Sequence, residues 1–274
     1  MQRLPILSIF KQSLALPFSR PVEFFKTIGL LIGVGIFAGV VSMIFMAVLG
    51  LSPAEGVSIP QELAAGNYGV LAHLVPMMLV FIFMIVMTTA YIFNFWVRAG
   101  AYGFEEARLR PLSAALSAAF VNGIKFLLIG LLIGVVGFVA ISIFSALGLA
   151  KGFGDQLAMS VSQDMAAATR AGMLNQIISL VTGAVVYSFF SANLTQTALK
   201  SDEEGLSHPH VGDFAVVLIL LYLVLLVPTT LAGLMGSMFG ATILNLVLGI
   251  FIMFAIGVAH GIRYRLCKEQ EVNA

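Results

Sequence analysis

The stretch TIGLLIGVGIFAGVVSMIFMAVLGL, residues 27–51, contains no charged side chain and decides the class of this protein. A helix that crosses the hydrocarbon core of a membrane needs about 20 consecutive, predominantly apolar residues. Five further stretches meet this length, so the sequence predicts six spans, at about 27–51, 70–97, 126–147, 173–199, 214–234 and 239–262. A chain with this pattern is expected to thread a membrane.

The composition agrees with a lipid environment. The chain has 274 residues, of which 60% are hydrophobic and 10% charged, and its mean hydropathy is +1.04. Soluble domains have about 45–50% apolar and about 25% charged residues. The net charge of +1 excludes a polybasic nucleic-acid binder, and the single Cys267 excludes an intramolecular disulfide or a cysteine-rich metal site.

Helix is the state expected for all six spans, because an open sheet would leave backbone polar groups unpaired in lipid. Strands of a membrane barrel would show alternating segments of about ten residues, whereas these runs are continuous. The first span is too long for a signal peptide and lacks a small-residue cleavage site, so we expect all six to be retained. The predicted fold is an all-α, polytopic bundle in which residues 1–274 form a single membrane domain.

The distribution of basic residues predicts the topology. Of the 14 lysines and arginines, 12 fall in the N-terminal arm, the C-terminal tail or the connections on the same side as the two termini. The opposite side has only Lys151 and Arg170. Loops rich in Lys and Arg stay in the cytoplasm, so both termini are expected there.

Three amphipathic segments are expected to lie at the membrane interface: residues 4–18, 111–125 and 155–173. In the first, Leu4, Leu7, Phe10, Leu14 and Phe18 recur at steps of three and four among basic residues. Such helices anchor a protein in the interface, with the basic face toward anionic headgroups.

The sequence GLLIGV occurs at residues 29–34 and again at 130–135. It fits either a duplicated helical hairpin or chance in a background rich in Gly, Leu and Ile. Glycines four residues apart are frequent, and they let helix backbones approach closely. They indicate packing within the bundle or, alternatively, a face for homo-oligomers. The pairs are 29/33, 35/39, 130/134, 236/240 and 257/261.

Polar side chains gather at the ends of the spans on the cytoplasmic side. Arginine suits bidentate recognition of phosphate, so these residues are candidates for binding a lipid headgroup, a small anion or a partner protein. The alternative is that they cap helix ends and extend to the interface. The candidates are Asn94, Arg98, Arg108, Arg110, His260 and Arg263, with Asn122 and Gln196 nearby.

The fourth span is the most polar, which favours an enclosed position. Asn175, Gln176 and Asn193 on this span, with Asn245 on the sixth, are candidates for a solute path around a cavity at mid-membrane depth. No Asp, Glu, Lys or Arg lies well inside any span, which disfavours a proton- or sodium-coupled carrier.

Residues 208–210, His-Pro-His, contain ligand types for a metal, but no second ligand pair has zinc-site spacing, so a polar turn is the better interpretation. We expect no metal and no cofactor.

The order of an amphipathic N-terminal helix, six spans and an Arg-containing stretch before span three resembles a known group. The residues that carry this likeness lie between Phe95 and Lys125, in particular Arg98-Ala-Gly and Arg110-Pro-Leu-Ser-Ala-Ala-Leu. The chain resembles the small six-helix bacterial inner-membrane proteins of the YciC type and the membrane domains attached to some glycerophosphodiesterases. The resemblance implies this architecture and a place in the bacterial inner membrane, and it transfers no catalytic residue.

Two functional hypotheses follow. The first is a non-enzymatic inner-membrane protein that acts as a subunit or scaffold and binds membrane lipid or another protein. The second is a carrier or flippase for a neutral small solute or lipid. An enzyme is the least favoured class, because no acid–base or nucleophile constellation is present.

Overall fold

The computed structural model describes residues 3–48, 69–149, 165–199 and 210–272, and every regular element in these ranges is a helix. Six helices are long and apolar enough to cross a membrane, which confirms an all-α, multi-pass membrane protein. The elements are α1 (Ile6–Ser19), α2 (Pro21–Val48), α4 (Gly69–Tyr102), α5 (Phe104–Arg108), α6 (Leu112–Ala146), α8 (Met165–Leu199), α9 (Val211–Leu234) and α10 (Met238–Val272).

Two predicted boundaries within the helices are wrong. Residues 111–125 are not a separate interfacial helix, because α6 runs unbroken from Leu112 to Ala146. Of the expected surface helix at 155–173, the described part is the start of α8, and 155–164 lie outside the described residues. Once a helix is nucleated, each added residue brings its own hydrogen bond, and no proline interrupts either segment. A 35-residue helix is about 52 Å long, so α6 continues beyond a hydrocarbon core of about 30 Å or crosses it at a tilt.

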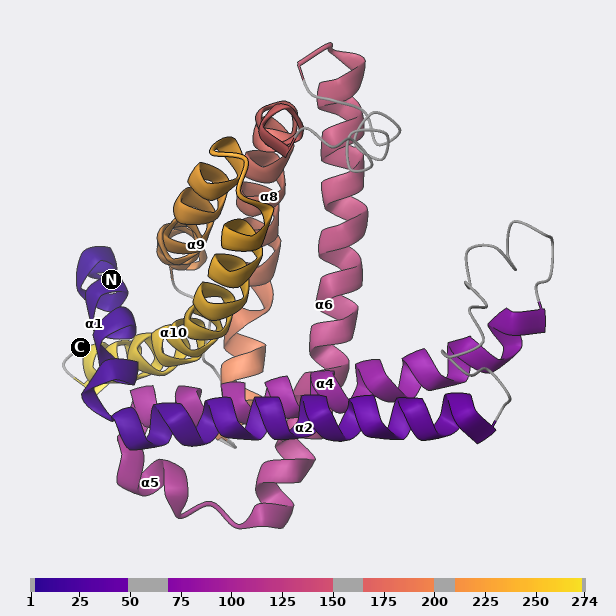
Figure 1. The fold of residues 1–274 in the computed structure, drawn as a ribbon. Coiled ribbons are helices and arrows are strands. Elements are labelled where there is room, and N and C mark those ends of the chain that lie inside the picture. The colour runs from indigo at the N-terminus through magenta and orange to yellow at the C-terminus, as the bar shows by residue number, and fades with distance from the viewer. Residues whose placement is uncertain (1–2, 49–68, 150–164, 200–209, 273–274) are drawn as a thin grey trace.

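Five helices form a ring. In the order α4, α6, α8, α9 and α10, each packs against the next, and α10 closes the ring on α4. Outside the ring, α2 packs along α4. Figure 1 shows α2 and α4 side by side and diverging from α6. The N-terminal half of α4, which we call its far half, therefore leaves the ring.

Glycines allow a close contact between α4 and α10 in the ring. A Cβ atom on Gly261 would collide with the backbone of Val97 and Ala101, and one on Gly257 would lie 2.9 Å from Trp96 Cβ. The pair 257/261 therefore packs within the bundle. At the pairs 29/33, 35/39 and 130/134 a Cβ would meet nothing within 4 Å among the described residues, so their part in self-association stays a prediction.

The tightly packed part of the molecule lies at one end. The core gathers the second halves of α4, α8 and α10 around the start of α9, with Trp96, Phe214 and Phe254 fully buried. Helix α1 packs on α9 and α10 and buries Ile9, Ser13 and Pro17, so much of its inner face meets protein rather than lipid.

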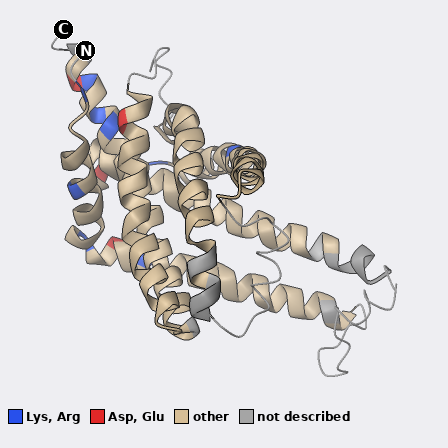
Figure 2. Ribbon diagram, turned by 90° about the horizontal axis from the view of Figure 1, so that it is seen from above, with Lys and Arg blue, Asp and Glu red and all other residues tan. Residues whose placement is uncertain are grey.

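Most charged side chains gather at this same end, beside the two termini (Figure 2). We call it the basic end. The opposite end, which we call the far end, contains the start of α8 and the turn at 235–237 between α9 and α10. Large apolar side chains of α2, α6 and the far half of α4 are exposed, as expected of surfaces that face lipid.

Candidate functional site

The structure divides the six candidate residues of the basic end into two groups. Asn94, His260 and Arg263 are buried, whereas Arg98, Arg108 and Arg110 lie nearer the surface. Neither of the two cavities described below includes any of these six residues in its lining.

The buried group forms links between helices. Asn122 on α6 donates from Nδ2 to Oδ1 of Asn94 on α4, over 2.6 Å, and to the carbonyl of Leu194 on α8, over 3.1 Å. On α10, His260 Nδ1 lies 2.8 Å from the Thr195 hydroxyl of α8. These bonds satisfy polar groups that would otherwise be unpaired in a dry interior, and they fix the register of α8 against its neighbours.

Arg263 occupies a similar position one turn further along α10. Its guanidinium donates to the Ser191 hydroxyl of α8 and lies over the ring of Phe214, 4.7 Å from the ring centre. A buried cation held by a hydroxyl and an aromatic face contributes to packing between α8, α9 and α10.

The three other arginines also bind within the chain. Arg108 lies 2.6 Å from the buried carboxylate of Glu23 on α2, and Arg98 donates to the Glu106 carbonyl over 3.0 Å. Arg110 donates to the Ala198 carbonyl over 2.6 Å, at the end of α8. Burial and the nearby charge of Arg98 lower the pKa of Arg110. These contacts tie the α5 segment to α2 and α8.

Glu23 was missed by the sequence reasoning. Its side chain is 8% exposed, and Lys26 and Arg108 both pair with it. It is the only acidic residue before Glu55, and this isolated position in the sequence could have marked it as a partner for basic residues.

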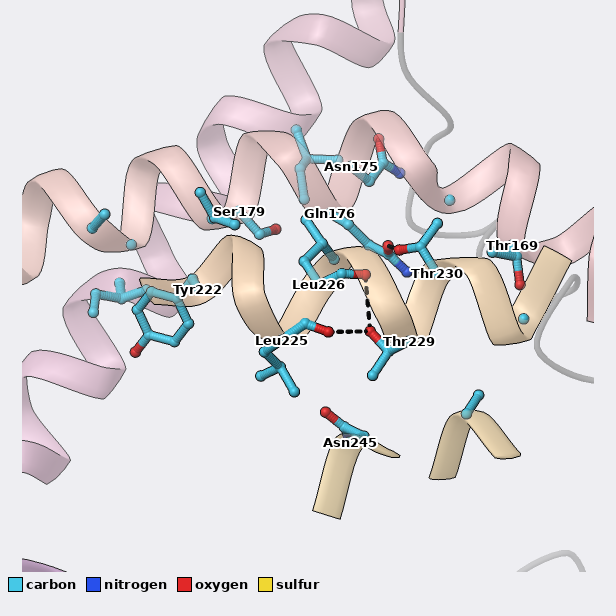
Figure 3. A pocket seen from close by; sticks show the side chains of 18 of the residues that line it. Thr169, Asn175, Gln176, Ser179, Tyr222, Leu225, Leu226, Thr229, Thr230 and Asn245 are labelled. Atoms are coloured by element: carbon cyan, nitrogen blue, oxygen red, sulfur yellow. Dashed lines mark hydrogen bonds between the residues drawn. The ribbon is translucent and has the colours of Figure 1, made fainter. Parts of the chain in front are cut away.

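A large cavity lies toward the far end. Its volume is about 860 Å³, and α6, α8, α9 and α10 all contribute to its wall. Figure 3 shows Thr169 toward one end of the cavity and Tyr222 toward the other, with amide and hydroxyl groups between them. None of the described residues that line it carries a charge.

The predicted solute-path residues meet at this cavity with one exception. Asn175 and Gln176 on α8 and Asn245 on α10 all line it, and Gln176 extends toward Thr230 of α9 (Figure 3). Asn193 is absent from the lining. It lies near the basic end, where its carbonyl accepts a hydrogen bond from Lys125. Eighteen helical residues separate it from Asn175, which is about 27 Å along the axis.

The depth also differs from the prediction. Asn175 lies close to the start of the apolar part of α8, and Thr229, Thr230 and Asn245 lie near the far ends of α9 and α10. The polar groups therefore surround the cavity nearer the far end than mid-membrane.

The hydroxyl groups on α9 are held in place by the chain itself. Thr229 donates to the carbonyls of Leu225 and Leu226 over 2.9 and 3.0 Å, and Thr230 donates to Gln176 Oε1 over 3.4 Å. Within the described residues, the Asn245 amide makes no hydrogen bond, so its donors and its acceptor are available to a ligand.

A second cavity of about 260 Å³ lies next to the first, on the side toward the basic end. Tyr187, Tyr222 and Leu225 line both cavities and so mark the boundary between them. The remaining wall is apolar except for Thr89, and it includes Phe93, Phe126 and Ile252. The sequence reasoning did not predict this cavity.

The histidine turn has a structural contact. His208 lies outside the described residues, whereas His210 Nδ1 is 3.3 Å from the Asp213 carboxylate, which also accepts from the backbone amide of Leu4. The described residues contain no group of three or more metal-ligating side chains.

No protein-family model, curated protein or solved structure matches this chain significantly. The likeness to the small six-helix inner-membrane proteins therefore stays a prediction.

Proposed function

We propose that this chain is a bacterial inner-membrane protein that binds an uncharged solute or lipid in the far-end cavity and carries it without changing it chemically. The observation behind the proposal is the cavity of about 860 Å³, whose described lining has amides and hydroxyls but no charge. It falls within the range of about 300–1,000 Å³ for ligand pockets, which have mostly apolar walls and a few placed polar groups.

The position of the cavity in the molecule supports this role. It lies away from the basic end, which we assign to the cytoplasm by the positive-inside rule. The closely packed residues of the basic end then separate the cavity from the cytoplasm. A binding site open on one side and closed on the other is what one state of a carrier requires.

A scaffold that binds through the basic end has less support. Each of the six candidate residues there already contacts another part of the chain, and these contacts serve the fold. That role, and the protein partner that it implies, stay predictions.

Native mass spectrometry tests the proposal. The full chain, released from membranes in mild detergent, is compared with the variant Gln176→Leu/Asn245→Leu. We expect the native chain to retain one uncharged ligand, and the variant to retain about tenfold less, since each lost hydrogen bond costs about 0.5–1.5 kcal/mol.

The matched control is Asn193→Leu/Gln196→Leu, which changes two amides of α8 outside the cavity. It should retain the ligand as the native chain does. A native chain with no retained mass, or an equal loss in both variants, would overturn the proposal.

A further inference from the structure

The first cavity has a partly polar lining, and the second cavity, which adjoins it, has an almost entirely apolar one. At the far end are the amides of Asn175, Gln176 and Asn245 and the hydroxyls of the neighbouring threonines. Beyond Tyr222 the wall becomes apolar, with Phe93, Phe126 and Ile252 among its residues. A ligand that matches both parts has a polar group at one end and an apolar chain at the other.

The charge of the polar group is constrained. Among the described residues that line either cavity there is no Lys, Arg, His, Asp or Glu. An ionised phosphate in such a wall would lose its hydration, and none of the described lining residues supplies a cation to offset that loss. Hydroxyl groups, by contrast, can both donate to and accept from the amides of Gln176 and Asn245.

The ring of helices is open toward lipid beside the cavities. Helices α6 and α10 both line the first cavity, and in the described part of the chain they do not pack closely against each other. The far half of α4 does not fill the space between α6 and α10, because it extends away from them beside α2 (Figure 1). Its Met78, Leu79 and Phe83 side chains are exposed. An amphiphile can therefore enter sideways from the bilayer.

We propose that the ligand is a membrane lipid with an uncharged, hydroxyl-bearing headgroup, whose apolar chain passes Tyr187 and Tyr222 into the second cavity. This inference rests on the proposed function and names its ligand class. The headgroup then lies among Gln176, Thr230 and Asn245 near the far face of the membrane. The chain points toward the middle of the bilayer, the orientation of a lipid in that leaflet.

Photo-crosslinking of the full chain in phospholipid vesicles tests the inference. One probe is a diacylglycerol with a diazirine at the end of one acyl chain. A second carries the diazirine near its glycerol hydroxyl. A third is phosphatidic acid with the chain-end diazirine. Crosslinked peptides are identified by mass spectrometry.

We expect the chain-end diacylglycerol probe to label residues of the second cavity, and the glycerol probe to label residues around Gln176 and Asn245. Labelling by phosphatidic acid should be about tenfold weaker, because its charge is not offset in the cavity.

A glycine gives a variant that fills the second cavity without disturbing the packing. Gly249 lines this cavity, and a Cβ there would meet nothing within 4 Å. Gly249→Leu should therefore fold and lower chain-end labelling several-fold. The matched control is Gly35→Leu on α2, which also has open space around it and lines neither cavity. It should label as the native chain does.

Each contrary outcome has one meaning. Labelling by the glycerol probe with none of the second cavity by the chain-end probe would overturn the inference and leave the proposed function standing. If phosphatidic acid labels as strongly as the chain-end diacylglycerol probe, the inference that the headgroup is uncharged is overturned. Absence of labelling at every lining residue with all three probes, together with no retained ligand in native mass spectrometry, would overturn both proposals.

Discussion

Single glycine positions set the contact between α4 and α10. Gly261 is the extreme case, because an added Cβ would fall against the Val97 carbonyl and the Ala101 amide, and these are backbone atoms that cannot rotate away. In lipid, no hydrophobic effect drives helices together. Small residues at a crossing stabilise it because they allow close van der Waals packing between the two backbones.

We predict that Gly261→Ala destabilises the bundle by about 1–3 kcal/mol, the cost typical of overpacking. Thermal unfolding in detergent, followed by loss of the monodisperse peak, measures the change. Gly134→Ala is the control, since its added methyl meets nothing within 4 Å and improves helix propensity. If the two variants melt alike, the close crossing is wrong.

The amide pair at the basic end gives a second prediction at this scale. Asn122→Leu removes the donor to Asn94 Oδ1 and to the Leu194 carbonyl, both buried. We expect a loss of about 1 kcal/mol, in line with hydrogen bonds between membrane helices. The double variant Asn94→Leu/Asn122→Leu should recover part of it, because it leaves one fewer buried polar group unpaired. Unfolding in a denaturing detergent gives both values, and strict additivity would argue against a direct bond.

At the scale of elements, α2 lies outside the ring and has few attachments. It packs along α4 and touches α1, and its first turn is held to α5 through Glu23 and Arg108. The two basic partners of Glu23 come from different segments, so the carboxylate joins α2 to the α5 segment.

We predict that Glu23→Ala loosens the start of α2 without unfolding the ring. Spin labels on α2 and α10, read by pulsed electron resonance, should show a broader distance distribution in the variant. Lys26→Ala, which leaves the Arg108 contact in place, should give the native distribution. An unchanged distribution in Glu23→Ala would show that packing on α4 alone fixes α2.

The elements themselves were predictable, because apolar length decides them in lipid. All six spans appear as helices, and Asn175, Gln176 and Asn245 do converge on one cavity. Asn193 does not line this cavity, because it lies 18 residues further along α8 than Asn175. The continuity of α6 was not predictable in this way. The pattern changes from amphipathic to apolar at residues 125–126, but the helix propagates through this change without a break. The second cavity depends on where α4 leaves the ring, which no local pattern encodes.

At the scale of the whole molecule, the orientation decides which side the cavity serves. Cys267 is the only cysteine and is buried, so the native chain gives little background in thiol labelling. Asn245→Cys places a thiol at the far-end cavity, and Glu105→Cys places one at the exposed α5 segment of the basic end.

In intact bacterial cells, a membrane-impermeant maleimide should label Asn245→Cys and leave Glu105→Cys unlabelled until the inner membrane is permeabilised. The reverse pattern would place the basic end outside the cell. The cavity would then face the cytoplasm, against the positive-inside rule.

The most direct measurement is an electron cryo-microscopy map of the full chain, enlarged by a bound antibody fragment and extracted with its native lipids. We expect density for one lipid among Gln176, Thr230 and Asn245, continuing past Tyr222 into the second cavity. A map in which both cavities are empty or closed by their own helices would contradict a lipid-binding carrier.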